Sequence, residues 1–249
     1  MIRNSKTQAQ WSDKVQQLIS CIRGWEIWRQ EPLVTMRTNS GGVESGLLAL
    51  YAYSRYVRRF TIIMCNVLSK VPEADDKFWR LAVNLYDELG GSNGFQLAHE
   101  KLIEGARHKP DSIPQAMWDK VTVEMDRLES AMMEDFKSST WPLILFAIGP
   151  GTESISDLFL DPIEGWTSDS LKFLPDVQAY FDVHRPEVEF EHQVEISRVL
   201  SEELAALPID IAESIYANGQ ILAGQIAKRH FQATYLCWQL SMKVETGQS

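Results

Sequence analysis

The chain has 249 residues, of which 45% are hydrophobic and 23% are charged, and this composition indicates a globular protein. Its net charge of −10 and its lack of a basic stripe argue against nucleic acid as a partner. The longest apolar runs, such as residues 141–148, are shorter than the ~20 residues that span a bilayer, and no apolar leader follows the first Met. We therefore expect a cytoplasmic protein without a membrane partner. Three cysteines without a CxxC spacing favour reduced thiols over disulfides or a zinc site.

Helical periodicity runs through the chain, and strand-like alternation is scarce. Apolar residues at Val15, Leu18 and Ile22 indicate a first helix, which Glu31-Pro32 should stop. A polar loop follows, and a second helix is predicted over residues 43–70. Further helices are predicted over residues 73–89, 97–103, 114–136, 141–158, 166–183, 186–204 and 208–244.

Several of these helices carry a specific expectation. Gly149-Pro150-Gly151 should kink or break the helix over 141–158. Leu89 should face inward from the third helix, and Ile211 and Ile221 should belong to the core face of the last and longest one. No repeat or linker divides the chain, so we predict one all-α domain over residues 1–249, built as a helical bundle.

Two histidines lie in an unusually acidic segment, His184-Arg-Pro-Glu-Val-Glu-Phe-Glu-His192. On a helix, Glu189 and His192 share a face, which is the Glu-x-x-His arrangement that holds iron or manganese inside helical bundles. Carboxylate and imidazole ligands together suit iron and leave positions open for dioxygen. The alternative interpretation is a solvated acidic helix face with incidental histidines.

A second pair of possible ligands, Glu88 and His99, flanks the glycine-rich segment 90–94. Their separation of eleven residues is close to three helical turns, so a roughly continuous helical path returns both side chains to one face. The glycine-rich segment matches neither GxGxxG nor GxxxxGK[ST], which excludes the common phosphate-binding loops.

Asn84-Leu-Tyr-Asp-Glu-Leu-Gly90 followed by His99 resembles the signature of haem-oxygenase-like diiron oxidases and oxygenases, often called iron-containing redox enzymes. Glu153, which lies 31 residues before His184, occupies the position of a further glutamate ligand of that family. Tyr180-Phe-Asp-Val-His184 resembles the lead-in to its ligand helix, and Tyr53-x-x-Tyr56-Val-Arg-Arg-Phe60 resembles its early helix. The resemblance covers residues 48–204 and implies a haem-oxygenase-like helical fold.

The chain departs from the family pattern at two places. The last motif fits only with one inserted residue, which puts Glu189 and His192 in the ligand positions and leaves Glu191 in reserve; a π-bulge can absorb such an insertion. The early-helix glutamate has no counterpart, because residues 47–72 contain no Asp or Glu before Pro72 ends the helix. Either a second iron is held weakly, or only one metal binds tightly.

The resemblance implies a non-haem iron-dependent oxidoreductase that uses dioxygen as co-substrate, with Fe(II), two per chain, as cofactor. Its catalytic residues would be Glu88, His99, Glu153 and His184, and its metal ligands these four with Glu189 and His192. The substrate would be a small amino-acid-like or other carboxylate compound of specialised metabolism, that is, natural product biosynthesis. A homodimer and an external electron donor are the other expected partners.

Arg55, Arg58 and Arg59, together with Tyr56, are candidates to bind the substrate, because a guanidinium pairs with a carboxylate through two hydrogen bonds. The alternative for the arginines is a solvated helix face. His230 has no motif partner and is expected to be a packing or surface histidine, and His108 also lacks a partner. Two other functions stay open: a metal-independent enzyme similar to pyrroloquinoline-quinone synthase or thiaminase, and a non-catalytic binding protein with a degenerate metal site.

Overall fold

The computed structural model describes residues 5–71, 76–89, 91, 103–107, 113–184 and 186–246. In these ranges the chain is helical and contains no strand, and the helices form a single compact body, which confirms the all-α prediction. His99 and His108 lie outside the described residues, as do the side chains of Glu88 and Glu189. The finer prediction, a haem-oxygenase-like arrangement, is taken up as a proposal below.

The helices, in chain order, are α1 (Ser5–Arg23), α2 (Glu31–Thr38), α3 (Gly42–Val57), α4 (Phe60–Leu68), α5 (Asp76–Glu88), α7 (Gln115–Ser138), α8 (Leu143–Ile148), α9 (Ser156–Leu171), α10 (Pro175–Val183), α11 (Pro186–Ala206) and α12 (Ile209–Glu245). Three short 3-10 turns, η1 (Glu26–Arg29), η4 (Gly105–Arg107) and η5 (Glu153–Ile155), connect some of them.

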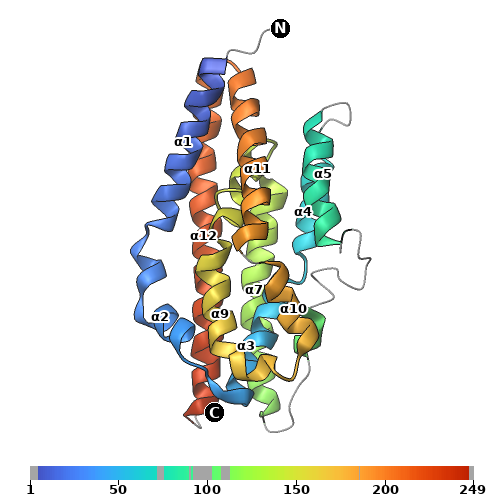
Figure 1. Cartoon of the computed structure of the whole chain (residues 1–249), viewed down its shortest axis with the longest axis vertical. Coiled ribbons are helices and arrows are strands. Elements are labelled where there is room, and N and C mark those ends of the chain that lie inside the picture. The colour runs from blue at the N-terminus through green and yellow to red at the C-terminus, as the bar shows by residue number, and fades with distance from the viewer. Residues whose placement is uncertain are drawn as a thin grey trace.

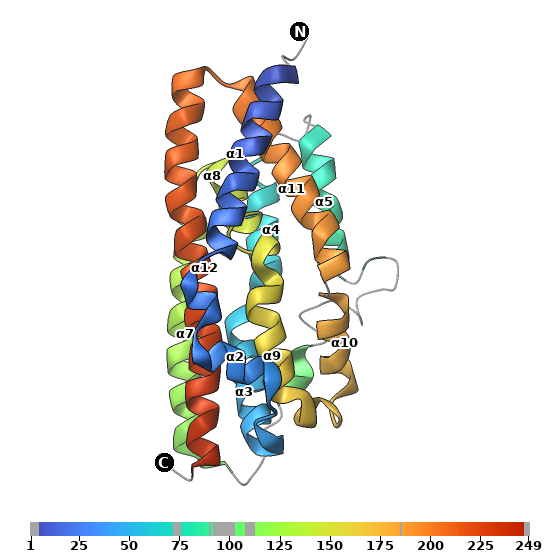
Figure 2. The ribbon, with the colours of Figure 1, turned by 60° about the vertical axis from the view of Figure 1, so that its left-hand side comes forward.

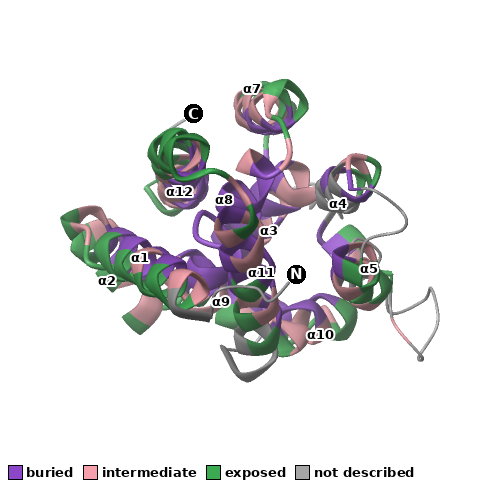
Figure 3. Ribbon diagram, turned by 90° about the horizontal axis from the view of Figure 1, so that it is seen from above, coloured by how far each residue is buried: buried purple, intermediate pink, exposed green. Residues whose placement is uncertain are grey.

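The longest helix, α12, runs along nearly the whole body, and its C-terminal end lies at the opposite end of the molecule from the N-terminus (Figure 1). It packs against α3, α8 and α7, while α3 also packs on α9 and α1 packs on α11. Figure 2 shows α7 beside the C-terminal half of α12. Seen from above, the buried faces of α3, α8 and α9 meet in the interior, and the exposed faces of α12, α7 and α5 point outward (Figure 3).

The boundaries of the last two helices agree with the sequence prediction, but several other predictions are wrong. Glu31-Pro32 begins α2 instead of stopping a helix, because proline in the first helical turn loses no intrahelical hydrogen bond. The helix predicted over 43–70 is divided by a turn at residues 58–59 into α3 and α4. Leu89, Ile211 and Ile221 are exposed rather than buried.

The helix predicted over 166–183 is also wrong, because residues 172–174 divide it into α9 and α10. Helix α9 begins ten residues earlier than predicted and continues through Pro162. Proline cannot donate to the carbonyl of Leu158, four residues before it, so an unbroken helix should leave that carbonyl without a partner. Here the Arg37 guanidinium of α2 donates to the Leu158 oxygen at 2.9 Å. A tertiary contact thus replaces the missing hydrogen bond and keeps α9 intact.

One stretch of the described chain, Leu143–Leu171, is long and apolar enough to cross a membrane by length and composition alone. The sequence prediction did not anticipate this stretch, because polar residues interrupt it and none of its continuous apolar runs is long enough to span a bilayer. In the fold this stretch is divided among α8, η5 and α9, and 83% of its most apolar window is buried. Core helices of soluble proteins satisfy the same criterion, so the stretch is weak evidence for a membrane span.

Candidate metal centre

The predicted break at Gly149-Pro150-Gly151 is present and positions Glu153. Helix α8 ends at Ile148, and η5 begins at Glu153. A Cβ on Gly151 would lie 2.6 Å from the Ala147 carbonyl oxygen and 3.1 Å from that of Ala223 in α12. Only glycine allows the turn to approach the α12 backbone this closely, so the residue type at position 151 fixes the place where Glu153 enters the interior.

Glu153 is a buried carboxylate, with 7% of the residue exposed. Its backbone carbonyl accepts a hydrogen bond from the Ser156 hydroxyl at 3.1 Å, but its carboxylate makes no hydrogen bond or ion pair with any residue that the structure describes. The Glu153 carboxylate is therefore not committed to another side chain of the described residues and is available to a ligand.

His230 of α12 anchors the turn immediately before Glu153. Its Nε2 lies 3.1 Å from the Thr152 hydroxyl, which itself donates to the Ala147 carbonyl at 3.0 Å. The hydroxyl proton is thus used, so Nε2–H donates to Thr152 and Nδ1, 3.3 Å from the Tyr56 hydroxyl, is the acceptor. Burial lowers the pKa of His230 to about 3, and its neutral ring stacks on Phe159 with centroids 4.3 Å apart.

Tyr56 belongs to this buried group as well. Its side chain is fully buried, its hydroxyl also lies 3.4 Å from the Met132 sulfur, and burial raises its pKa well above the usual value. His230 is therefore a packing histidine and not a surface one, the two roles that the sequence left open. The predicted substrate-binding role of Tyr56 stays a prediction, and the structure places its hydroxyl in the core beside His230.

His192 lies on a seam of charged contacts between α5 and α11. Lys77 pairs with Glu203 at 2.5 Å, and Arg80 pairs with Glu202 at 2.6 Å and with Glu195. At the other end of α5, His192 Nε2 lies 3.2 Å from Asp87 Oδ2. His192 is buried, and Asp87 immediately precedes Glu88, the last residue of α5. The seam therefore brings the predicted ligand helix α11 against the end of α5.

His184 follows the last residue of α10, and its side chain is half-buried. Its Nδ1 lies 2.7 Å from the Tyr180 carbonyl oxygen, and a carbonyl only accepts, so Nδ1 carries the proton. The ring also packs on the Tyr180 ring, with centroids 4.2 Å apart. A hydrogen bond from one ring nitrogen to a backbone carbonyl is the usual way in which proteins orient a metal-binding histidine.

The three arginines of the early helix point to α7. Arg55 makes two hydrogen bonds to Asp126, at 3.0 and 2.5 Å, and Arg59 makes two to Glu129, which is fully buried. Arg58 lies 3.5 Å from Asp126 and 3.6 Å from Glu129. These contacts tie α3 to α7 and argue against a solvated face. A substrate carboxylate would have to compete with Asp126 and Glu129, and the substrate-binding role stays a prediction.

Three of the six predicted ligands, Glu153, His184 and His192, lie among the described side chains. Within the described ranges, no three His, Cys, Asp or Glu side chains converge closely enough to hold a metal ion. Two further polar residues near these ligands were not predicted. Asp87 stood within the Asn84–Gly90 motif, whereas Thr152 carried no sequence signal. No protein-family model and no curated protein matches the chain.

Proposed function

We propose that the chain is a non-haem iron-dependent oxidoreductase of the haem-oxygenase-like fold, which uses dioxygen to oxidise or cleave a small amino-acid-like or other carboxylate substrate. The observation that carries the proposal is Glu153, a residue only 7% exposed whose carboxylate makes no hydrogen bond or ion pair with the described residues. Such a carboxylate can bind a cation, and the imidazole and carboxylate types of the predicted set suit iron.

Iron would be held by the six predicted ligands together, because the three described ones, Glu153, His184 and His192, do not by themselves form a group that could hold a metal ion. Glu88, His99 and Glu189 are the other predicted ligands. When bound, Fe(II) supplies the electrons that reduce dioxygen. The Tyr180 carbonyl holds the proton of His184 on Nδ1 and directs the Nε2 lone pair away from that carbonyl. The stacked Phe159 and His230 rings and the Tyr56 hydroxyl pack beside the turn that carries Glu153 and exclude water from that side.

Anaerobic loading with Fe(II), followed by metal analysis and oxygen-consumption measurements, tests the proposal. We expect about one iron or more per chain for the wild type, and a loss of most of that iron in Glu153→Gln. Glu134→Gln, an exposed substitution in α7 with the same change of charge, is the matched control and should bind as much iron as the wild type.

The melting temperature of the metal-free protein separates loss of a ligand from loss of the fold. Because the Glu153 carboxylate makes no ion pair with the described residues, Glu153→Gln should be about as stable as the wild type, while its iron content falls. His184→Ala should likewise lose iron and abolish iron-dependent oxygen consumption. The proposal fails if the wild type binds less than about half an iron per chain, or if Glu153→Gln keeps its iron.

The His192–Asp87 contact also has a purely structural explanation, as the last ion pair of the α5–α11 seam. The two explanations differ in what Asp87→Asn does. A structural ion pair contributes stability, so the variant would lower the melting temperature and leave iron affinity unchanged. A carboxylate that orients a ligand histidine changes metal affinity by about 10- to 100-fold when it is removed. We expect the second result.

A further inference from the structure

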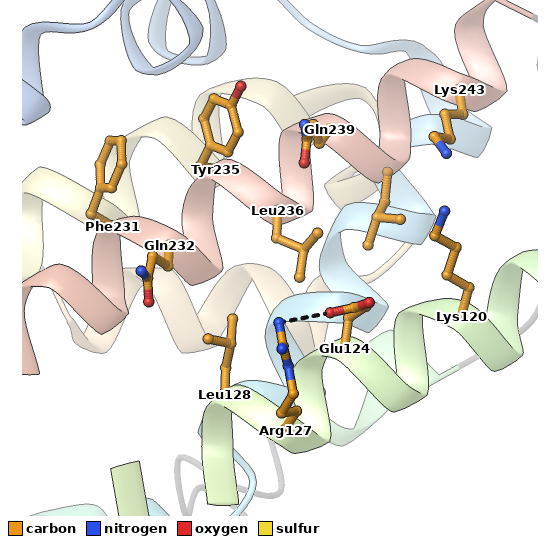
Figure 4. Close-up of a pocket in the computed structure, with 11 residues that line it drawn as sticks. Lys120, Glu124, Arg127, Leu128, Phe231, Gln232, Tyr235, Leu236, Gln239 and Lys243 are labelled. Carbon is orange, nitrogen blue, oxygen red and sulfur yellow. Dashed lines mark hydrogen bonds and ion pairs between the residues drawn. The ribbon is translucent and has the colours of Figure 1, made fainter. Parts of the chain in front are cut away.

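A cleft of about 530 Å³ lies between α7 and α12, on a part of the fold that the proposed metal centre does not use. Figure 4 shows Leu128 of α7 and Leu236 of α12 lying between the two helices, with Arg127 hydrogen-bonded to Glu124 at 3.2 Å beside them. Buried Leu240 completes the apolar lining. The volume lies within the usual range for a small-molecule site.

Two lysines face each other at one end of this cleft. Lys120 extends from α7 and Lys243 from α12, and their ammonium groups point toward one another (Figure 4). The close approach of Lys120, first through a hydrogen bond between the two amines and then through its charge, lowers the pKa of Lys243. In the described part of the chain, neither lysine is paired with a carboxylate (Figure 4). The arrangement is unfavourable by itself, and an anion between the two ammonium groups would relieve it.

The positive charge at this end of the cleft contrasts with the net negative charge of the protein. Acidic residues exceed basic ones by ten, yet here two cations approach each other, and the one acid among the described residues that line the cleft, Glu124, is hydrogen-bonded to Arg127. The nearby Arg127 is already neutralised by Glu124. Beyond the two lysines, Leu128, Leu236 and Leu240 line the cleft beside the Glu124–Arg127 pair, and this pattern matches a ligand with an anionic head and an apolar chain.

We propose that the α7–α12 cleft binds a free amphipathic organic anion, with its head between Lys120 and Lys243 and its aliphatic chain along Leu128, Leu236 and Leu240. The site is separate from the proposed metal centre. The glycine turn before Glu153 contacts α12 at Ala223, and Lys243 lies twenty residues further along the helix, a rise of about 30 Å. The proposal thus does not rest on iron or on catalysis.

Isothermal titration calorimetry with octyl phosphate tests the proposal on the full chain. Butyl phosphate should bind about tenfold more weakly, because less apolar surface is buried. Neutral octanol should also bind at least about tenfold more weakly than octyl phosphate, because it lacks the charge. Equal affinity for octyl phosphate and octanol would refute the role of the lysines.

Matched variants locate the site. Lys120→Gln/Lys243→Gln should weaken octyl phosphate binding by about tenfold or more. Lys137→Gln/Lys228→Gln changes the charge equally on the same two helices outside the cleft, and should leave the affinity within about twofold. The cleft variant should not melt below the control variant, since it removes a repulsive pair.

Equal affinities of the two double variants would overturn the proposal. The alternative source of such an anion is a lipid surface, which flotation with phosphatidylglycerol vesicles detects. Vesicle binding that depends on Lys120 and Lys243, without binding of free octyl phosphate, would also overturn the proposal and assign the cleft to a membrane surface.

Discussion

The neutral, buried His230 predicts a specific dependence of stability on pH. In the unfolded chain its pKa is near the ordinary value of 6.5, whereas in the fold burial lowers it to about 3. Between these two values the unfolded state binds a proton that the folded state does not bind. Stability from this residue is therefore fully present above pH 6.5 and decreases as the pH falls toward 3.

The magnitude follows from the pKa difference. Each pH unit below 6.5 should remove about 1.4 kcal/mol, so the loss at pH 4.5 is about 2.7 kcal/mol. His230→Gln keeps an amide that can donate to Thr152 but cannot titrate. The difference in unfolding free energy between wild type and variant should therefore shrink by about 2.7 kcal/mol between pH 7 and pH 4.5.

Urea unfolding of both proteins, followed by circular dichroism at pH 7, 5.5 and 4.5, measures this difference. Titration of the other histidines and of the carboxylates occurs in both proteins and cancels. Parallel stability curves for wild type and variant would show that the fold does not lower the pKa of His230, and would refute its assignment as a histidine that stays neutral below pH 6.5.

The other predictions concern stability. Glu129→Gln removes the buried partner of Arg59 and should cost about 2–3 kcal/mol in chemical unfolding; this is less than for a fully buried pair, because a third of the Arg59 side chain is exposed. An unchanged unfolding midpoint would contradict that role. Gly151→Ala should lower the free energy of unfolding by about 1–3 kcal/mol, because its Cβ would meet two backbone oxygens. Gly224→Ala is the control: its Cβ would lie 3.3 Å from a Trp25 side-chain carbon, and the variant should be neutral or stabilising. Equal melting temperatures for the two alanine variants would show that the turn can relax.

The features predicted from the sequence are those that local chemistry determines. The break at residues 149–151 follows from glycine and proline, and the two last helices follow from periodicity and from prolines at their starts. The path of α9 through Pro162 was not predictable, because it depends on a hydrogen bond from Arg37 in another helix. The exposure of Ile221 was equally hidden, since periodicity identifies an apolar face but not which neighbour covers it.

For the candidate site, sequence reasoning identified residue types at recognisable spacings and missed residues whose partners are distant in the chain. Glu153 was found through its spacing from His184, and the structure adds its burial. The His230–Thr152 contact joins residues 78 positions apart, and His230 has no motif partner, so the contact could not be predicted even though Thr152 directly precedes Glu153. Asp87 was quoted within a motif, but its contact with His192 depends on how α5 packs against α11.

The length of α12 has a consequence for local motions. Its 37 residues form one rod of about 55 Å, and its N-terminal part carries exposed isoleucines while His230 lies in the buried part. Amide hydrogens along this one helix should therefore exchange with very different protection, fastest near Ile211 and slowest around His230. A ligand at Lys243 should slow amide exchange mainly in the last turns of α12. Exchange rates at the end of this helix would then measure ligand binding, and those around His230 would measure the stability of the fold.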